Sequence, residues 1–111
     1  QAGLTARSTA MTQTNLAILA NIDAKPAHVA DVEALLKGAI ELANQEAGTT
    51  SWFAFKLSDT QFGIFDTFAH EEGRQAHLAG DIAKALLGKA DEWLSQAPDI
   101  LMAQVLAAKM P

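Results

Sequence analysis

The stretch 61–68 (QFGIFDTF), together with the preceding 51–57 (SWFAFKL), decides the fold. Both segments are rich in aromatic residues, which favour β-strands over helices. The three residues between them, 58–60 (SDT), have the length and composition of a short hairpin loop. We therefore expect two antiparallel strands near the middle of the chain, joined by a tight turn.

A strand and a helix precede this hairpin. The run from Leu16 to Ala24 (LAILANIDA) is short and apolar and ends at Lys25-Pro26, which predicts a strand. From there the apolar period becomes helical, with one stripe formed by Val29, Val32, Leu35, Leu36, Ala39, Ile40 and Ala43. We expect Gly48 to end this helix through a left-handed cap.

A split helical segment and a last strand follow the hairpin. A short helix is expected from about His70 to Ala79, and Asp81 is a suitable N-cap for a second, longer helix. Pro98 ends that helix, and 99–108 (DILMAQVLAA) is predicted to be a strand. The order is β-α-β-β-α-β, so we predict an α+β fold of the ferredoxin-like type with a four-stranded antiparallel sheet.

The composition indicates one soluble domain, which we place at residues 16–108. The chain has 111 residues, and residues 1–15 are predicted to be an N-terminal tail in which Met11 is a candidate natural start. A net charge of −5 argues against nucleic acid as a partner. No apolar run approaches the roughly 20 residues that span a bilayer, so no membrane partner is expected. The chain contains no cysteine, and a cytoplasmic location is the prediction.

The strand faces predict a homodimer. In the strand 51–57, Phe53 and Phe55 oppose Trp52, and in 99–108, Met102 and Val105 lie on opposite faces. Two helices cover only one face of such a sheet, so a second apolar face is left to be buried. Packing of that face against a second copy about a two-fold axis is the simplest arrangement. A monomer with an apolar binding face is the alternative.

The ordered set of segments resembles the antibiotic biosynthesis monooxygenase family. The resemblance rests on 17–26 (AILANIDAKP), 46–49 (EAGT), 62–68 (FGIFDTF), 75–78 (QAHL) and 82–86 (IAKAL). It covers residues 16–108 and implies a dimeric α+β barrel. It also implies an activity such as that of the members that oxidise phenols or quinols with O₂ and no cofactor. The haem-degrading members carry a Trp and a helical His where this chain has Phe68 and no His, so no cofactor is expected. No metal is expected either, because His70 and His77 are seven residues apart, whereas a zinc-binding helix places its two His four apart.

Five side chains are candidates for a site between the sheet and the helices. Asp66 and His77 are the candidate catalytic residues, because a carboxylate or an imidazole is able to take a proton from a phenol. Asn21, Trp52 and Phe68 are the candidate substrate-binding residues for a small apolar or aromatic molecule. The structural alternatives are that His77 bridges a dimer interface, that Asp66 bonds backbone, and that Trp52 and Phe68 belong to the core.

Three functions remain open at this stage. The first is a cofactor-independent monooxygenase acting on a small aromatic phenol or quinol. The second is a non-catalytic ligand-binding or signalling module on the same dimeric barrel. The third is a different small reaction on this scaffold, such as an isomerisation or a decarboxylation. Fold alone does not choose among them.

Overall fold

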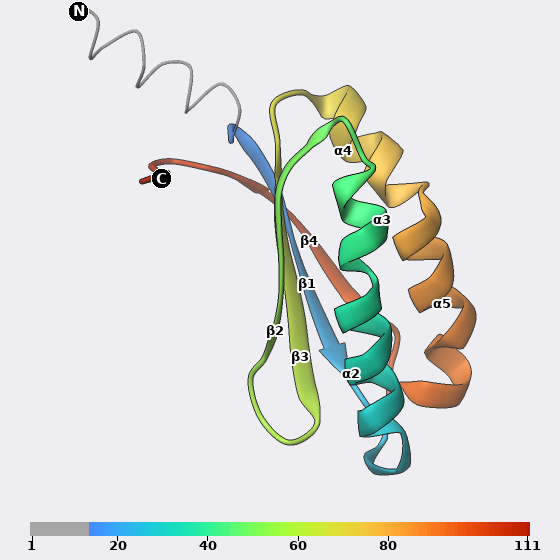
Figure 1. The fold of residues 1–111 in the computed structure, drawn as a ribbon. Coiled ribbons are helices and arrows are strands. Elements are labelled where there is room, and N and C mark those ends of the chain that lie inside the picture. The colour runs from blue at the N-terminus through green and yellow to red at the C-terminus, as the bar shows by residue number, and fades with distance from the viewer. Residues whose placement is uncertain (1–13) are drawn as a thin grey trace, which may run out of the picture.

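A computed structural model describes residues 14–111 as one α+β unit (Figure 1). Residues 1–13 of the predicted tail, including Met11, lie outside the described residues. The elements, in chain order, are β1 (Leu16–Asp23), η1 (Pro26–His28), α2 (Val29–Gly38), α3 (Ile40–Asn44), β2 (Thr49–Lys56), β3 (Gln61–Phe68), α4 (Glu71–Leu78), α5 (Asp81–Trp93) and β4 (Asp99–Gln104). This order confirms the predicted β-α-β-β-α-β fold.

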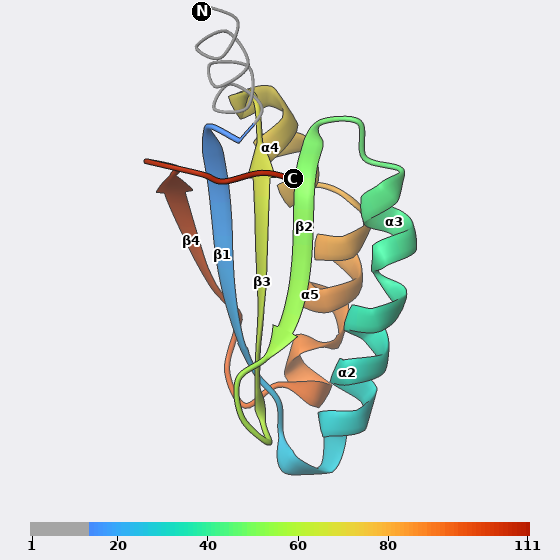
Figure 2. The same ribbon diagram turned by 60° about the vertical axis from the view of Figure 1, so that its left-hand side comes forward.

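The sheet has four strands in the order β2-β3-β1-β4, and all three pairings are antiparallel (Figure 2). The first strand in sequence therefore lies inside the sheet, and the last strand forms one edge. The register pairs Ile18 with both Asp66 and Met102, and it pairs Asp66 with Trp52. Because side chains of paired residues share a face, these four residues lie on one side of the sheet.

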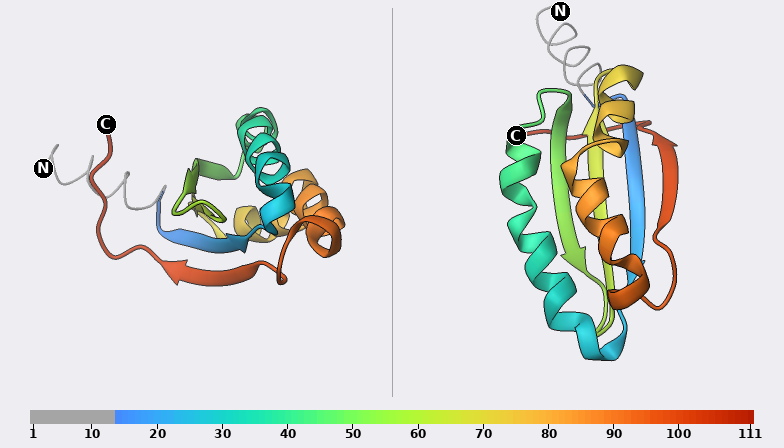
Figure 3. Two further views of the ribbon diagram at one scale, coloured as in Figure 1. Left: turned by 90° about the horizontal axis from the view of Figure 1, so that it is seen from below. Right: turned by 90° about the vertical axis from the view of Figure 1, so that its right-hand side faces the viewer.

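The helices cover that side only, as the end-on and side views show (Figure 3). The main core between the two layers is built from small and branched apolar side chains. Its buried members are Ala20, Ile22, Ala24, Val32, Leu36, Phe62, Ile64, Leu86 and Leu94. A second, smaller cluster joins Ala39, Ala43 and Ile82, and Trp52 packs against both clusters. The helical stripe predicted from the sequence thus supplies one part of the helix side of the core, and α5 supplies another.

Four local expectations need correction. The first helix is divided, because α2 ends at Gly38 and α3 begins at Ile40. Gly48 forms no left-handed cap, since no glycine within residues 14–111 has a positive φ. Asp81 is the first residue of α5 and Gly80 is its N-cap, without a side-chain hydrogen bond. The last strand ends at Gln104 rather than at residue 108.

The face without helices carries an apolar row that crosses all four strands. Phe53, Phe65, Leu19 and Leu101 are register partners in that order, from β2 to β4. Phe53 is 58% exposed and Leu101 is 45% exposed, and the two inner residues are half-buried. The ring of Phe55 extends this surface by lying over Gly63, where a Cβ atom would be only 2.4 Å from the ring. The second apolar face predicted from the sequence is therefore present.

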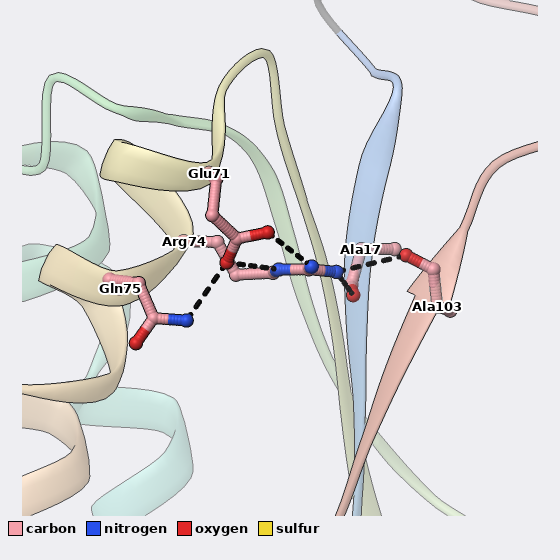
Figure 4. Close-up of polar contacts among 5 residues, drawn as sticks. All are labelled: Ala17, Glu71, Arg74, Gln75 and Ala103. Atoms are coloured by element: carbon pink, nitrogen blue, oxygen red, sulfur yellow. Dashed lines mark hydrogen bonds and ion pairs between the residues drawn. The ribbon is translucent and has the colours of Figure 1, made fainter.

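Arg74 ties α4 to the sheet on the side of β4 (Figure 4). Its Nη1 donates to the carbonyl oxygens of Ala17 and Ala103, which belong to neighbouring strands, each at 3.1 Å. Its Nε and Nη2 donate to the Glu71 carboxylate, which also accepts a hydrogen bond from Gln75. A mostly buried guanidinium is thus satisfied by backbone and by a carboxylate, and it fixes where α4 begins.

Candidate functional site

His77 is held between two carboxylates that come from different parts of the chain. It lies in the last turn of α4 and is buried. Its Nδ1 is 2.7 Å from Oε1 of Glu46, which follows α3, and its Nε2 is 2.8 Å from Oδ2 of Asp66 in β3. The second contact falls outside hydrogen-bond geometry, so we treat it as an ion pair. The structure brings both predicted catalytic residues together.

Three further contacts hold this group in position. The hydroxyl of Thr49 donates to Oε1 of Glu46 at 2.7 Å, and the rings of Phe68 and His77 pack at 5.4 Å between centroids. Gly48 and Gly73 meet closely, since a Cβ atom on Gly48 would lie 2.8 Å from the Gly73 Cα. The absence of both side chains lets the segment before β2 approach α4, which brings Glu46 to His77.

The surrounding charges set the protonation state of His77. Burial of the ring disfavours the charged form, but the carboxylates of Asp66 and Glu46 outweigh this effect and raise the pKa of His77 to about 8. At neutral pH the imidazole is therefore mostly a cation with both ring nitrogens facing carboxylate oxygens. In that state His77 has no free lone pair with which to accept a proton.

The stability of the fold is expected to depend on this charge. The folded-state pKa of about 8 lies above the ordinary value of 6.5, so the contribution is fully present below pH 6.5. It is lost as the pH rises through 8, and the shift corresponds to about 2 kcal/mol. Urea unfolding at fixed protein concentration is expected to give a lower free energy of unfolding at pH 9 than at pH 6.

Two variants separate His77 from other titrating groups in this measurement. His77→Leu is expected to remove most of the difference between pH 6 and pH 9, because it removes the group that titrates. His70→Gln, which changes an exposed histidine near the start of α4, is expected to retain it. Equal stability of the wild-type protein at the two pH values contradicts the electrostatic reading of His77.

An apolar cavity of about 500 Å³ lies between the β2 edge of the sheet and the first helical pair. Its apolar lining comes from Leu36, Ile40, Trp52, Phe53, Ala54, Phe55 and Phe62. Glu33, Lys37 and Lys56 complete the lining, and Lys56 and Lys37 both pair with Glu33 at 3.2 and 3.1 Å. A cavity of this size and lining suits a flat apolar molecule.

Trp52 separates this cavity from the charged group. It lines the cavity and is the register partner of Asp66 on the same face of the sheet. Asp66 is 1% exposed, and it lines neither the apolar cavity nor the two more polar hollows beside α3 and α4. His77 and Glu46 instead line a more polar hollow of about 580 Å³ on the far side. The indole of Trp52 therefore forms a wall between apolar space and the buried carboxylate.

The position expected for Asn21 needs correction. Asn21 pairs with Gly63 and Asp99, so its side chain lies on the face without helices, opposite to Asp66. The structure thus groups Asp66, His77 and Phe68, sets Trp52 beside them, and leaves Asn21 apart. The alternation along β1 was sufficient to show this, since Ile22 and Ala20 are core residues on the other parity.

Glu46 is the member of the group that the sequence did not identify as a site residue. It lies between a helix and a strand, 31 positions from His77, and no spacing rule joins the two. The available signal was an acidic residue followed three positions later by Thr49, whose side chain is not part of the core. Within residues 14–111 no set of three or more His, Cys, Asp or Glu side chains is placed to hold a metal ion.

Comparison with solved structures identifies a clear relative of this chain. A Nitrosomonas europaea protein of unknown function is 48% identical, with a TM-score of 0.87 over 90% of this chain and 97% of that one. A second protein from the same organism, assigned as an antibiotic biosynthesis monooxygenase, is 11% identical with a TM-score of 0.75 over 83% of this chain and 99% of that chain. One from Bacteroides thetaiotaomicron, assigned likewise, is 21% identical with a TM-score of 0.73, over 88% and 97%.

The last two similarities concern the fold alone, because identity is low. No family model and no curated protein matches the sequence. None of the helices within residues 14–111 is long and apolar enough to cross a membrane.

Proposed function

Because this chain belongs to the family of the Nitrosomonas europaea protein of unknown function and has the fold of the antibiotic biosynthesis monooxygenases, we propose that it is a cofactor-independent monooxygenase. Its substrate is a small aromatic phenol or quinol that binds in the apolar cavity beside β2. The observation that carries the proposal is a buried carboxylate, Asp66, directly behind the Trp52 wall of that cavity.

In this proposal Asp66 is the group that takes a proton from the substrate. Its Oδ2 faces His77, while its Oδ1 has no hydrogen-bond partner among the described residues. The imidazolium of His77 offsets the negative charge of the carboxylate and holds it in one orientation. Glu46 in turn orients the imidazole through Nδ1. His77 is then a positioning residue below pH 8, and Asp66 is the catalytic one.

The reaction needs no bound reductant, because the substrate supplies the electrons. An anthrone is in equilibrium with its phenolic tautomer, and loss of the hydroxyl proton from that tautomer gives an electron-rich anion that reacts with O₂ at the ring carbon. One oxygen atom ends as the carbonyl that replaces the CH₂, and the other leaves as water with the two hydrogens. The four electrons that reduce O₂ come from oxidation of that carbon. The apolar lining of the cavity favours this course, because it reduces the contact between the anion and water.

A non-catalytic ligand-binding module on the same scaffold is the second candidate. The near-complete burial of Asp66 favours it, because a substrate reaches the carboxylate only if Trp52 moves. On this reading the charged group is structural, and the cavity alone carries the function. Turnover separates the two candidates, since both predict that a flat apolar molecule binds.

Oxygen uptake with hydroxylated anthrones, naphthols and naphthohydroquinones tests the proposal directly. We expect protein-dependent uptake of one O₂ per carbonyl formed with an anthrone, and one ¹⁸O atom in the product from ¹⁸O₂. Added flavin, haem or metal ions are expected to be unnecessary. Tight binding of these compounds without uptake contradicts catalysis and supports the binding module, and an absence of binding contradicts both.

A further inference from the structure

Two polar atoms on neighbouring strands are buried without hydrogen-bond partners, and one of them belongs to a residue that lines the apolar cavity. They are Nε1 of Trp52 and Oδ1 of Asp66, and neither makes a hydrogen bond within the described residues. Trp52 and Asp66 are direct register partners, so their Cβ atoms are about 5 Å apart on the same face. An unsatisfied buried donor or acceptor is costly, and most such groups in native proteins have a partner.

We propose that Nε1 of Trp52 and Oδ1 of Asp66 together bind one free hydroxyl group of the substrate. The proposal rests on the proposed function and states which end of the substrate enters first. The hydroxyl oxygen accepts a hydrogen bond from the indole N–H, and the hydroxyl proton is donated to the carboxylate. One hydroxyl group thus satisfies both unpartnered atoms. Its proton, which must leave in the reaction, is directed at the carboxylate oxygen that takes it.

Only a group that both donates and accepts fits this pair. The indole N–H is a donor only, and an ionised carboxylate is an acceptor only. A quinone carbonyl or an aryl ether accepts but cannot donate, so it leaves Oδ1 unsatisfied. A carboxylate on the ligand meets the negative charge of Asp66. The site therefore selects phenols and quinols over their ethers, over quinones and over aromatic acids.

Trp52 is placed to admit the hydroxyl by a movement of its own side chain. It lies on β2, which is an edge strand, and it is only half-buried. Its indole lines the apolar cavity on one side and a smaller hollow of about 170 Å³, bounded by α3 and β2, on the other. A turn of the indole toward this smaller hollow opens the way from the apolar cavity to Asp66 without unfolding the sheet.

Matched ligands and matched variants test the proposal. Calorimetric titration of the protein with 1-naphthol and with 1-methoxynaphthalene compares a free hydroxyl with its ether on the same ring. We expect the wild-type protein to bind 1-naphthol at least roughly 10-fold more tightly, as for hydrogen bonds to a charged partner. Trp52→Phe removes the N–H and keeps an aromatic ring, and it is expected to reduce this preference to about 3-fold or less.

Trp93→Phe is the matched control. Trp93 packs against the same core from α5 and stacks on His28 at 6.2 Å, away from Asp66. This variant loses an indole N–H as well and is expected to keep the full preference. Asp66→Leu, which removes the acceptor, is expected to abolish the preference while 1-methoxynaphthalene still binds.

The outcomes distinguish a failure of the hydroxyl site from a failure of the proposed function. Binding of both ligands with equal affinity by the wild-type protein overturns the hydroxyl site and leaves the cavity proposal standing. A preference that survives Trp52→Phe overturns the role of Trp52, and it indicates that a buried water satisfies the indole instead. Failure of both ligands to bind overturns the cavity proposal together with this inference.

Discussion

Replacing Asp66 with asparagine is expected to lower oxygen uptake with an anthrone by roughly 100-fold or more, the usual scale for a lost proton acceptor. Asparagine keeps the shape of the side chain and removes both its charge and its basicity. The fold is expected to persist, because the amide oxygen is still able to face His77 across the present 2.8 Å contact. Initial rates of oxygen uptake and a thermal unfolding curve measure the two effects on one preparation.

Two other carboxylates provide controls for this substitution. Glu72→Gln neutralises an exposed acid in the first turn of α4 and is expected to leave the rate unchanged. Glu46→Gln neutralises the other partner of His77 without touching the proposed proton acceptor. It is expected to lower the pKa of His77 and to move the alkaline limb of the pH–rate profile to lower pH. An unchanged rate in Asp66→Asn, with the fold intact, removes Asp66 from the chemistry.

Replacing Phe53 with aspartate is expected to convert a homodimer into a monomer. We infer the dimer from the apolar row Phe53, Phe65, Leu19 and Leu101 on the face that no helix covers. A charge placed within such an interface is buried without a partner, which weakens association by roughly 100-fold or more. Sedimentation at micromolar concentration is expected to give a dimer for the wild type and an 11.8 kDa species for the variant.

Leu87→Asp is the matched control for this experiment. Leu87 is 58% exposed, the same fraction as Phe53, but it lies on α5 and therefore on the opposite side of the molecule. An aspartate there is expected to leave the dimer intact. A wild-type protein that sediments as a monomer at micromolar concentration contradicts the proposed use of the open face.

The fold was accessible from sequence because its signals are local and periodic. The aromatic runs around Ser58 predict β2 and β3, and the helical stripe from Val29 to Ala43 predicts which side chains enter the core. The errors fall at element ends, where tertiary contacts decide. Gly48 was expected to take a left-handed conformation, whereas its lack of a side chain permits close contact with Gly73. Such a contact depends on a segment 25 positions away and has no local signature.

The site was accessible only in part, for a related reason. Asp66 and His77 stood out as polar residues in apolar surroundings, and the structure joins them at 2.8 Å. Whether they catalyse a reaction remains a prediction. Glu46 was missed because its contact with His77 links a loop to a helix 31 positions away, and the sequence does not relate the two. Asn21 was placed on the wrong face of β1, although strict alternation from the buried Ile22 gives the right one.

The strand order has a consequence for the order of events during synthesis. Of the four strands β1 is translated first, yet it lies inside the sheet and pairs on one side with β4, the last of the four to be translated. The row that crosses the open face is therefore incomplete until Leu101 has left the ribosome. Before that point the nascent chain carries Phe53 and Phe65, but the edge strand β4 is still missing from the sheet. Self-association through the full row has to wait until β4 has emerged, when all four strands are available to fold as one cooperative unit.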